Sequence, residues 1–155
     1  MPIQKITPCL WLEKEANKAA EYYISIFKDG EILSYRAYEN APEAGGSFDL
    51  ATIRVLNMEF QLLAAGPMFK FNEAVSFSIR CADQAEVDYY WDSLTADGGK
   101  EGPCGWCADK YGLSWQIVPE RYYELESHAD KSKQDYAFHA LMKMKKIIIA
   151  DLEEH

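Results

Sequence analysis

This sequence contains an internal repeat, which restricts the fold more than any other feature. A displacement of 67 residues places Tyr23 on Tyr90. A displacement of 55 residues places the six residues that begin at Met58 on the six that begin at Leu113, because the first copy has a longer loop. Such a repeat predicts two modules of one plan. Each sheet is expected to bury one face against its own helix and to offer the other face to a shared cavity.

Hydrophobic periodicity predicts the elements of the first copy. Apolar and polar residues alternate over 3–12, which predicts a strand. The period then changes to that of a helix over 14–28, and Gly30 ends this helix. The remaining strands of the copy are predicted over 31–39, 48–56 and 58–64.

The second copy repeats this order. A strand is predicted over 74–81, and Asp83 with Glu86 forms a capping box at the start of a helix. Two strands follow around 104–110 and 113–119. Residues 120–132 are polar and in part helical, and 133–153 are predicted to form a closing amphipathic helix. Its apolar stripe, which covers the sheet or serves a dimer interface, is Ala137, Leu141, Met144, Ile148 and Leu152.

Together these elements predict an α+β fold in which residues 1–155 form a single domain. Paired βαβββ modules at 3–65 and 73–119 form an open, barrel-like cavity, and residues 120–155 add a helical C-terminal extension. A chain of 155 residues of which 48% are hydrophobic is large enough to bury such a core.

The charge of the chain restricts its partners. With 25 acidic and 16 basic residues the formal net charge is −9, so nucleic acid and anionic membrane surfaces are not expected as partners. No apolar run is long enough to span a bilayer, and the N-terminus lacks the apolar core of a signal peptide. A cytoplasmic domain with reduced thiols is therefore expected, with a small molecule as its partner.

Three segments carry a resemblance to a known family. They are ITPCLWL (6–12), GPMFKFNEAVSFSIRC (66–81) and GPCGWCADKYGLSWQIVP (102–119). With the two helices they cover nearly all of residues 3–119, and they resemble the PhnB-like branch of the vicinal oxygen chelate superfamily (the glyoxalase, bleomycin-resistance and dioxygenase fold). Many members of this branch carry the label 3-demethylubiquinone-9 3-methyltransferase. The resemblance implies the paired-module fold and a homodimer.

The resemblance also implies where a metal would bind. In metal-using relatives one ligand comes from the first and last strand of each module. These positions fall at Cys9 (or Thr7), Gln61, Ser76 and Gln116. The repeat pairs Cys9 with Ser76 and Gln61 with Gln116. This set supplies at most one anion, and the histidines lie beyond the second module at His128, His139 and His155. Because a divalent ion needs anionic or basic donors, no metal and no cofactor are predicted.

Alternation places a set of side chains on the sheet faces opposite the apolar stripe. The predicted ligand-binding residues are Thr7, Cys9, Trp11, Gln61, Ser76, Ser78, Arg80, Ser114 and Gln116. Arg80 favours an anionic or carbonyl-bearing ligand, unless it forms a salt bridge with a neighbouring acid. Trp11 could stack on a planar ligand, whereas Trp106 is expected in the core. The alternative is that the polar groups pair with one another in a filled cavity.

The CGWC motif is the remaining chemical signal. A redox pair needs a helix N-terminus to lower the pKa of its first thiol, and no helix pattern follows Cys104 and Cys107. A structural zinc site would need a second pair, but only Cys9 and Cys81 remain, on distant strands.

These observations lead to one interpretation of function with three alternatives. The leading interpretation is a metal-free small-molecule-binding protein. The alternatives are a metal-dependent lyase, isomerase or dioxygenase, a thiol redox protein, and a structural domain with a filled cavity. No motif supports the methyltransferase label, because Gly45–Gly46, the glycine pair near a strand start, lies in a hairpin loop. A Ser-His-Asp triad is not supported either, since the double module contains no histidine.

Overall fold

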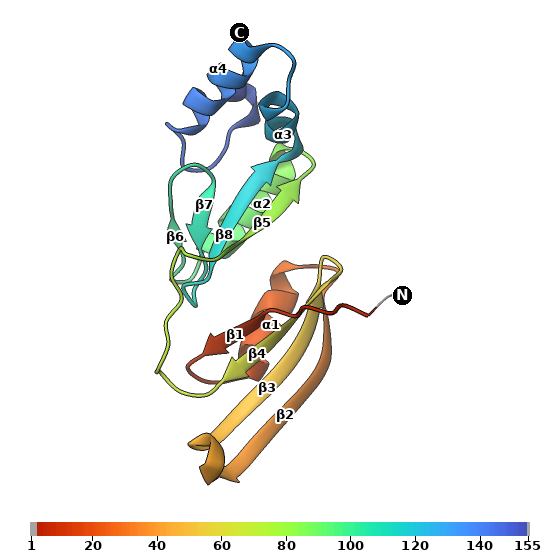
Figure 1. The fold of residues 1–155 in the computed structure, drawn as a ribbon, viewed down its shortest axis with the longest axis vertical. Helices are drawn as coiled ribbons and strands as arrows, with labels where there is room; N and C mark the ends of the chain where they lie inside the picture. Colours follow the sequence, from red (N-terminus) through yellow and green to blue (C-terminus); the bar gives the residue numbers. More distant parts are fainter. Residues whose placement is uncertain (1–2, 155) are drawn as a thin grey trace. The chain divides into compact units, whose positions relative to one another are not determined.

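The chain divides into two compact units, one ending at Lys70 and the other beginning at Phe71 (Figure 1). The structure is a computed structural model that describes residues 3–154. Each unit has the βαβββ order that the repeat predicts, so the α+β class and the paired modules are confirmed. Neither four-stranded sheet closes into a barrel within the described part of the chain.

In the first unit, a mixed sheet has the strand order β1-β4-β3-β2. The edge strand β1 is parallel to β4, and the other pairs are antiparallel. Its elements are β1 (Cys9–Leu12), α1 (Ala16–Ile26), β2 (Glu31–Ala41), the 3-10 helix η1 (Pro42–Ala44), β3 (Gly46–Val55) and β4 (Met58–Ala64).

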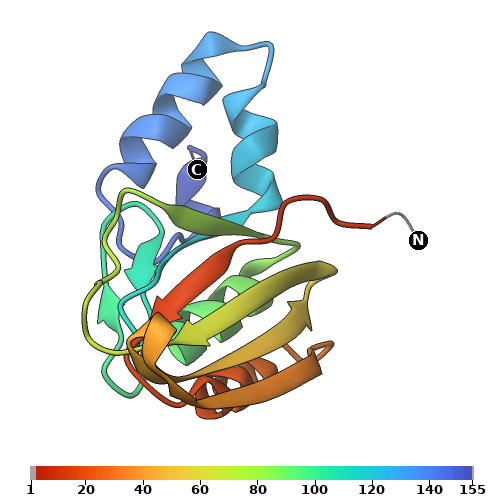
Figure 2. The same ribbon diagram turned by 60° about the horizontal axis from the view of Figure 1, so that its bottom comes forward.

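The second unit repeats this topology and adds the C-terminal extension. Its sheet has the order β5-β8-β7-β6, with β5 parallel to β8. The elements are β5 (Ser76–Cys81), α2 (Gln84–Thr95), β6 (Lys100–Glu101), β7 (Trp106–Ala108) and β8 (Ser114–Pro119). The extension contains α3 (Glu120–Glu126), α4 (Lys131–Leu141) and the 3-10 helix η2 (Ile149–Leu152). Figure 2 shows α3 and α4 side by side, in cyan and blue, beyond the end of β8.

Each sheet buries one face against its own helix, as the periodicity predicts. In the first unit Leu62 and Ile53 pack on the side of the sheet that α1 covers with Tyr23 and Phe27. In the second unit the same arrangement places α2 on β8 and β5, and it buries the α2 residues Val87, Tyr90, Trp91 and Leu94. Burying a large apolar side chain contributes about 1.5–3 kcal/mol, so these faces hold each unit together. The opposite face of each sheet is left open to other uses.

The predicted capping box at α2 is confirmed. The Asp83 carboxylate accepts a hydrogen bond from the Glu86 N–H at 2.9 Å, and the Glu86 carboxylate accepts one from the Ala82 N–H at 2.9 Å. The first N–H of α1 is paired differently, because Asp49 of β3 accepts from the Ala16 N–H at 2.9 Å. No residue close to Ala16 in sequence supplies this cap, so sequence reasoning did not find it.

The first predicted strand is too long. Pairing begins at Cys9 rather than at residue 3, because Pro8 has no N–H to donate to a neighbouring strand. The Pro8 carbonyl still accepts a hydrogen bond from the Gln61 N–H at 2.9 Å. The chain before β1 is therefore held to β4 without being a strand there.

The predicted closing helix over 133–153 is wrong. Helix α4 ends at Leu141, because the carbonyls of Met144 and Lys145 accept hydrogen bonds from Cys104 and Gly105 instead of continuing a helix. The apolar pattern still indicates burial correctly, since the buried cluster consists of Val118, Leu125, Ala137, Ile147 and Leu152, with Leu141 and Met144 packed against it. Most of the stripe is therefore used inside the second unit. Within residues 3–154 no helix is long and apolar enough to cross a membrane.

Candidate functional site

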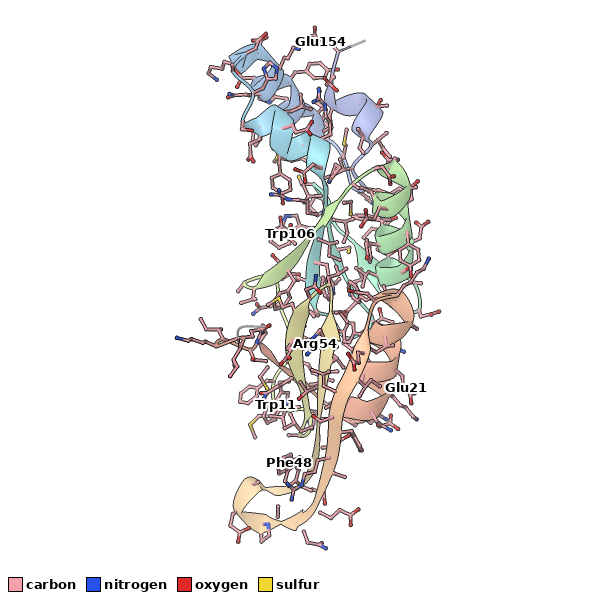
Figure 3. All side chains as sticks on the ribbon, turned by 90° about the vertical axis from the view of Figure 1, so that its right-hand side faces the viewer. Trp11, Glu21, Phe48, Arg54, Trp106 and Glu154 are labelled. Carbon is pink, nitrogen blue, oxygen red and sulfur yellow. The ribbon has the colours of Figure 1, made fainter. Side chains whose placement is uncertain are left out.

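On the open face of the first sheet, three of the predicted residues come together. Cys9 lies opposite Gln61 in the parallel pairing of β1 with β4, and Trp11 lies two residues further along the same face. In Figure 3, Trp11 projects from the side of the sheet away from Glu21, which lies on α1. Thr7 precedes β1 and is half-buried outside the strand pairing.

The Trp11 ring is fixed by the segment that follows β4. Its indole N–H donates to the Gly66 carbonyl at 2.9 Å, and the ring packs edge-on against Phe69 with a centroid distance of 4.9 Å. This indole N–H is therefore already used within the first unit.

On the open face of the second sheet, the predicted polar residues form a connected row. Gln116 donates a hydrogen bond from Nε2 to Ser76 Oγ at 2.9 Å. Ser114, which is only 2% exposed, lies opposite Ser76 on β5 and opposite Ala108 on β7. Gln116 itself lies opposite Ser78 and Trp106. Alternation therefore assigned the face of these residues correctly.

The strand pairing changes one detail of the repeat. Gln61 lies opposite Cys9, whereas Gln116 lies opposite Ser78, so Ser78 rather than Ser76 is the structural equivalent of Cys9. The offset is two residues, and it preserves the face because side chains alternate along a strand. The displacement of 67 aligns the buried faces of the helices, whereas the register of the parallel strands is set by the sheet itself.

At the far end of this face, Arg80 and Ser78 contact the C-terminal extension. Arg80 pairs with Glu120 at 3.4 Å, and its guanidinium lies 4.2 Å from the ring centroid of Tyr123. The Ser78 and Tyr123 hydroxyls are 3.3 Å apart. Arg80 thus forms the salt bridge that the sequence left open as its alternative role.

Beside the polar row, the second unit contains a hollow with a volume of about 470 Å³. Its floor and walls include Trp106 and Ala108 of β7, Ser114 of β8, Lys100 of β6 and the Cys104 turn. The lining is mostly apolar, which is typical of small-molecule sites. Sequence reasoning named only Ser114 from this group. It expected Trp106 in the core, although alternation along β7 places Trp106 and Ala108 on one face.

Polar groups at the hollow have unused capacity. Among residues 3–154, Lys100 and Glu73 make no ion pair, and the Trp106 indole N–H makes no hydrogen bond. Glu101 differs, because it accepts a hydrogen bond from the Trp91 indole N–H at 3.1 Å and lies 3.8 Å from the Lys145 ammonium. The hollow therefore offers an ammonium and an indole N–H to a ligand.

The geometry of the CGWC motif does not fit a redox pair. All four cysteines are free, and Cys107 is buried on β7 with 4% of its surface exposed. Burial raises the pKa of the Cys107 thiol to about 12, and the charge of Asp109 adds to the effect. Cys104 lies in a turn that leads into a strand, as the sequence predicts, so no helix N-terminus stabilises a thiolate there.

The donor set at the four metal positions does not fit a divalent ion. Burial raises the pKa of the Cys9 thiol, and the remaining groups are amides and a hydroxyl. Across residues 3–154 no group of three His, Cys, Asp or Glu side chains is placed to hold a metal ion. His128 Nδ1 accepts a hydrogen bond from the Asp130 N–H at 2.9 Å, and His155 lies outside the described residues.

The buried thiols lead to a prediction about pH. Burial raises the pKa of Cys81 and of Cys107 to about 12, with acidic neighbours adding to it. Such a thiol stabilises the fold fully below its unfolded pKa of about 8.5, and this contribution is lost as the pH rises toward the folded value. We therefore expect the free energy of unfolding to fall above about pH 8.5, and to fall less steeply in Cys107→Ala.

Urea unfolding followed by circular dichroism between pH 8 and pH 11 measures this slope. Cys104→Ala is the control, because it removes the half-exposed cysteine of the same motif. Equal slopes for Cys107→Ala and the unmodified chain would contradict the effect of burial.

Comparison with known proteins adds a family. Residues 4–118 match the model of the family described as 3-demethylubiquinone-9 3-methyltransferase. No curated protein matches the chain. Because the family match ends at Val118, the C-terminal extension lies outside it.

Solved structures share the fold. The PhnB protein of Bacillus cereus, itself named for the same methyltransferase, is 29% identical, with a TM-score of 0.64 over 75% of this chain and 99% of that protein. Protein PA1353 of Pseudomonas aeruginosa is 18% identical, with a TM-score of 0.62 over 76% and 98%. The fosfomycin resistance protein FosX of Listeria monocytogenes is 14% identical, with a TM-score of 0.52 over 76% and 94%.

Proposed function

This chain belongs to the 3-demethylubiquinone-9 3-methyltransferase family, within the vicinal oxygen chelate superfamily, and we propose that it binds a small molecule on the open face of its second sheet. The observation that supports this most directly is the hollow of about 470 Å³ beside the Gln116–Ser76 pair. Concave, mostly apolar surfaces with a few polar groups are the usual form of such sites.

The lining of the hollow favours a planar ligand that carries a carbonyl or a carboxylate. The Trp106 ring offers an apolar surface, and its N–H together with the Lys100 ammonium offers hydrogen bonds to an acceptor. An acceptor matches these donors, whereas a cationic ligand would find only the Glu73 carboxylate. The anionic or carbonyl-bearing ligand suggested by Arg80 is thus proposed for a different pair of donors on the same face.

Binding is proposed to be independent of a metal ion. FosX of Listeria monocytogenes has been crystallised with Mn(II), which makes a metal-dependent enzyme the alternative. The donor chemistry of this chain argues against that alternative, since amide and hydroxyl groups are weak ligands for a divalent ion. No glycine-rich turn between a strand and a helix supports a methyl-donor site either.

The proposal is tested with benzoate as the probe and benzylamine as its cationic counterpart. We expect benzoate to bind with a Kd on the order of 1 mM, as suits so small a ligand, and benzylamine to bind more weakly. Titration followed by two-dimensional NMR measures both. The benzoate affinity is expected to be the same in EDTA and in added Mn(II). An affinity that depends on Mn(II) would favour the metal-dependent enzyme.

Three variants place the probe. Ala108→Leu fills the hollow and is expected to abolish benzoate binding, whereas Ala37→Leu makes the same change on an exposed strand of the first unit and serves as the control. Lys100→Met should weaken binding about threefold, and Glu73→Gln should strengthen it slightly, because exposed charges contribute about 0.2–1 kcal/mol. Unchanged binding in Ala108→Leu would contradict the proposed site.

A further inference from the structure

The segment that follows α4, residues 142–149, lies against the wall of the hollow and is named here the C-terminal strap. Its carbonyls at Met144 and Lys145 accept hydrogen bonds from the Cys104 and Gly105 N–H groups, both at 2.8 Å. The Cys104 and Met142 sulfurs are 3.7 Å apart. The strap thus pairs with the turn that forms one side of the hollow, although it lies about 40 residues further along the chain and outside the family match.

The turn has little freedom between the strap and β8. Gly105 has a φ of +82°, and a Cβ there would lie 2.8 Å from Ile147 Cδ1 and 3.1 Å from the Ile117 carbonyl oxygen. The Gly105 carbonyl accepts a hydrogen bond from the Ile117 N–H at 2.8 Å. Since Ile147 is only 1% exposed, the strap side of this contact is also packed. The position of the wall therefore depends on the position of the strap.

The strap is held on its other side by one residue of α2. Gln84 donates from Nε2 to the Ile147 carbonyl at 3.0 Å and accepts at Oε1 from the Ile149 N–H at 2.7 Å. Both ends of the amide are therefore used on the same segment. Lys146 adds an ion pair to Asp88 of α2 at 3.0 Å, but that pair is partly exposed to solvent and contributes less.

We propose that the C-terminal strap is a positioning element of the ligand site, and that Gln84 is the residue that holds it in place. The inference rests on the proposed function. If the strap fixes the wall of the hollow, loosening the strap weakens ligand binding, and ligand binding in turn steadies the strap, since coupling between two sites is reciprocal. The extension then defines how this chain differs from relatives that end with β8.

The test uses Gln84→Ala in the full chain, with Gln134→Ala as the matched control. Gln134 bonds the His128 carbonyl within the extension and does not contact the strap. Losing two buried hydrogen bonds, each worth about 1 kcal/mol, should raise the hydrogen exchange rates of the Cys104 and Gly105 amides about tenfold or more in Gln84→Ala. Gln84→Glu, which keeps the acceptor for Ile149, should give an intermediate rate. Mass spectrometry of peptides from the exchanged protein measures these rates.

Benzoate provides the second arm. In the unmodified chain it should slow exchange of the strap amides, and Gln84→Ala should weaken benzoate binding severalfold while Gln134→Ala leaves it unchanged. Unchanged exchange at Cys104 and Gly105 in Gln84→Ala overturns the positioning role, whether or not benzoate binds. Faster exchange with unchanged benzoate affinity overturns the coupling. Absence of benzoate binding to the unmodified chain contradicts the proposed function alone, because the exchange arm needs no ligand.

Discussion

Asp109→Ala is expected to lower the free energy of unfolding by about 4 kcal/mol, since it leaves buried donors without an acceptor. The Asp109 carboxylate is 2% exposed and accepts hydrogen bonds from the Trp115 indole N–H at 2.9 Å and from the Tyr111 and Leu113 N–H groups at 2.9 and 3.2 Å. This one side chain therefore organises the turn between β7 and β8. The two residues that follow and precede those bonds in the sheet, Ala108 and Ser114, line the hollow.

Urea unfolding of Asp109→Ala and Asp109→Asn separates the charge from the hydrogen bonds. The asparagine carbonyl keeps one acceptor, so Asp109→Asn should lose less than Asp109→Ala. Asp135→Ala, which removes an exposed carboxylate paired only with Lys131 on α4, should change stability by less than about 1 kcal/mol. A loss for Asp109→Ala as small as that of Asp135→Ala would contradict the structural role of the carboxylate.

Gly105→Ala is expected to cost about 3 kcal/mol, the second largest effect. About 1 kcal/mol comes from forcing a residue with a Cβ into the left-handed region. The remainder comes from overpacking, because the new methyl group would lie 2.8 Å from a methyl group of the buried Ile147. The same substitution should displace the strap and weaken benzoate binding, since the turn forms a wall of the hollow.

Gly112→Ala is the matched control for this change. Gly112 also has a positive φ, +87°, but a Cβ added there would have no neighbouring atom within 4 Å. It should therefore lose only the conformational part, about 1 kcal/mol. The difference between the two variants in urea unfolding measures the contact with the strap. Equal losses would mean that Ile147 moves aside at no cost, which would contradict a tightly packed wall.

The site could be predicted from the sequence only where residues alternate within regular strands. Gln116 and Ser114 were found in this way, because a strand of six residues shows its two faces in its pattern. Strand β7 has only three residues, so its alternation is a weak signal and Trp106 was assigned to the core. Lys100 and Glu73 gave no signal, since β6 has two residues and Glu73 lies in a connection.

By itself, the sequence determined the two βαβββ units, the face of each sheet that meets its helix, and the capping box at Asp83. These features depend on hydrophobic periodicity and on hydrogen bonds between residues a few positions apart, and both are readable in a linear chain. Only the tertiary structure decided that Arg80 pairs with Glu120, that Asp49 caps α1, and that the chain leaves helix α4 to pair with the Cys104–Gly105 turn. The partners in these contacts are 33 or more residues apart, so no local pattern records them. The apolar spacing over 133–153 correctly indicated what would be buried, but the choice between a continuing helix and a strap depended on two N–H groups supplied by a distant turn.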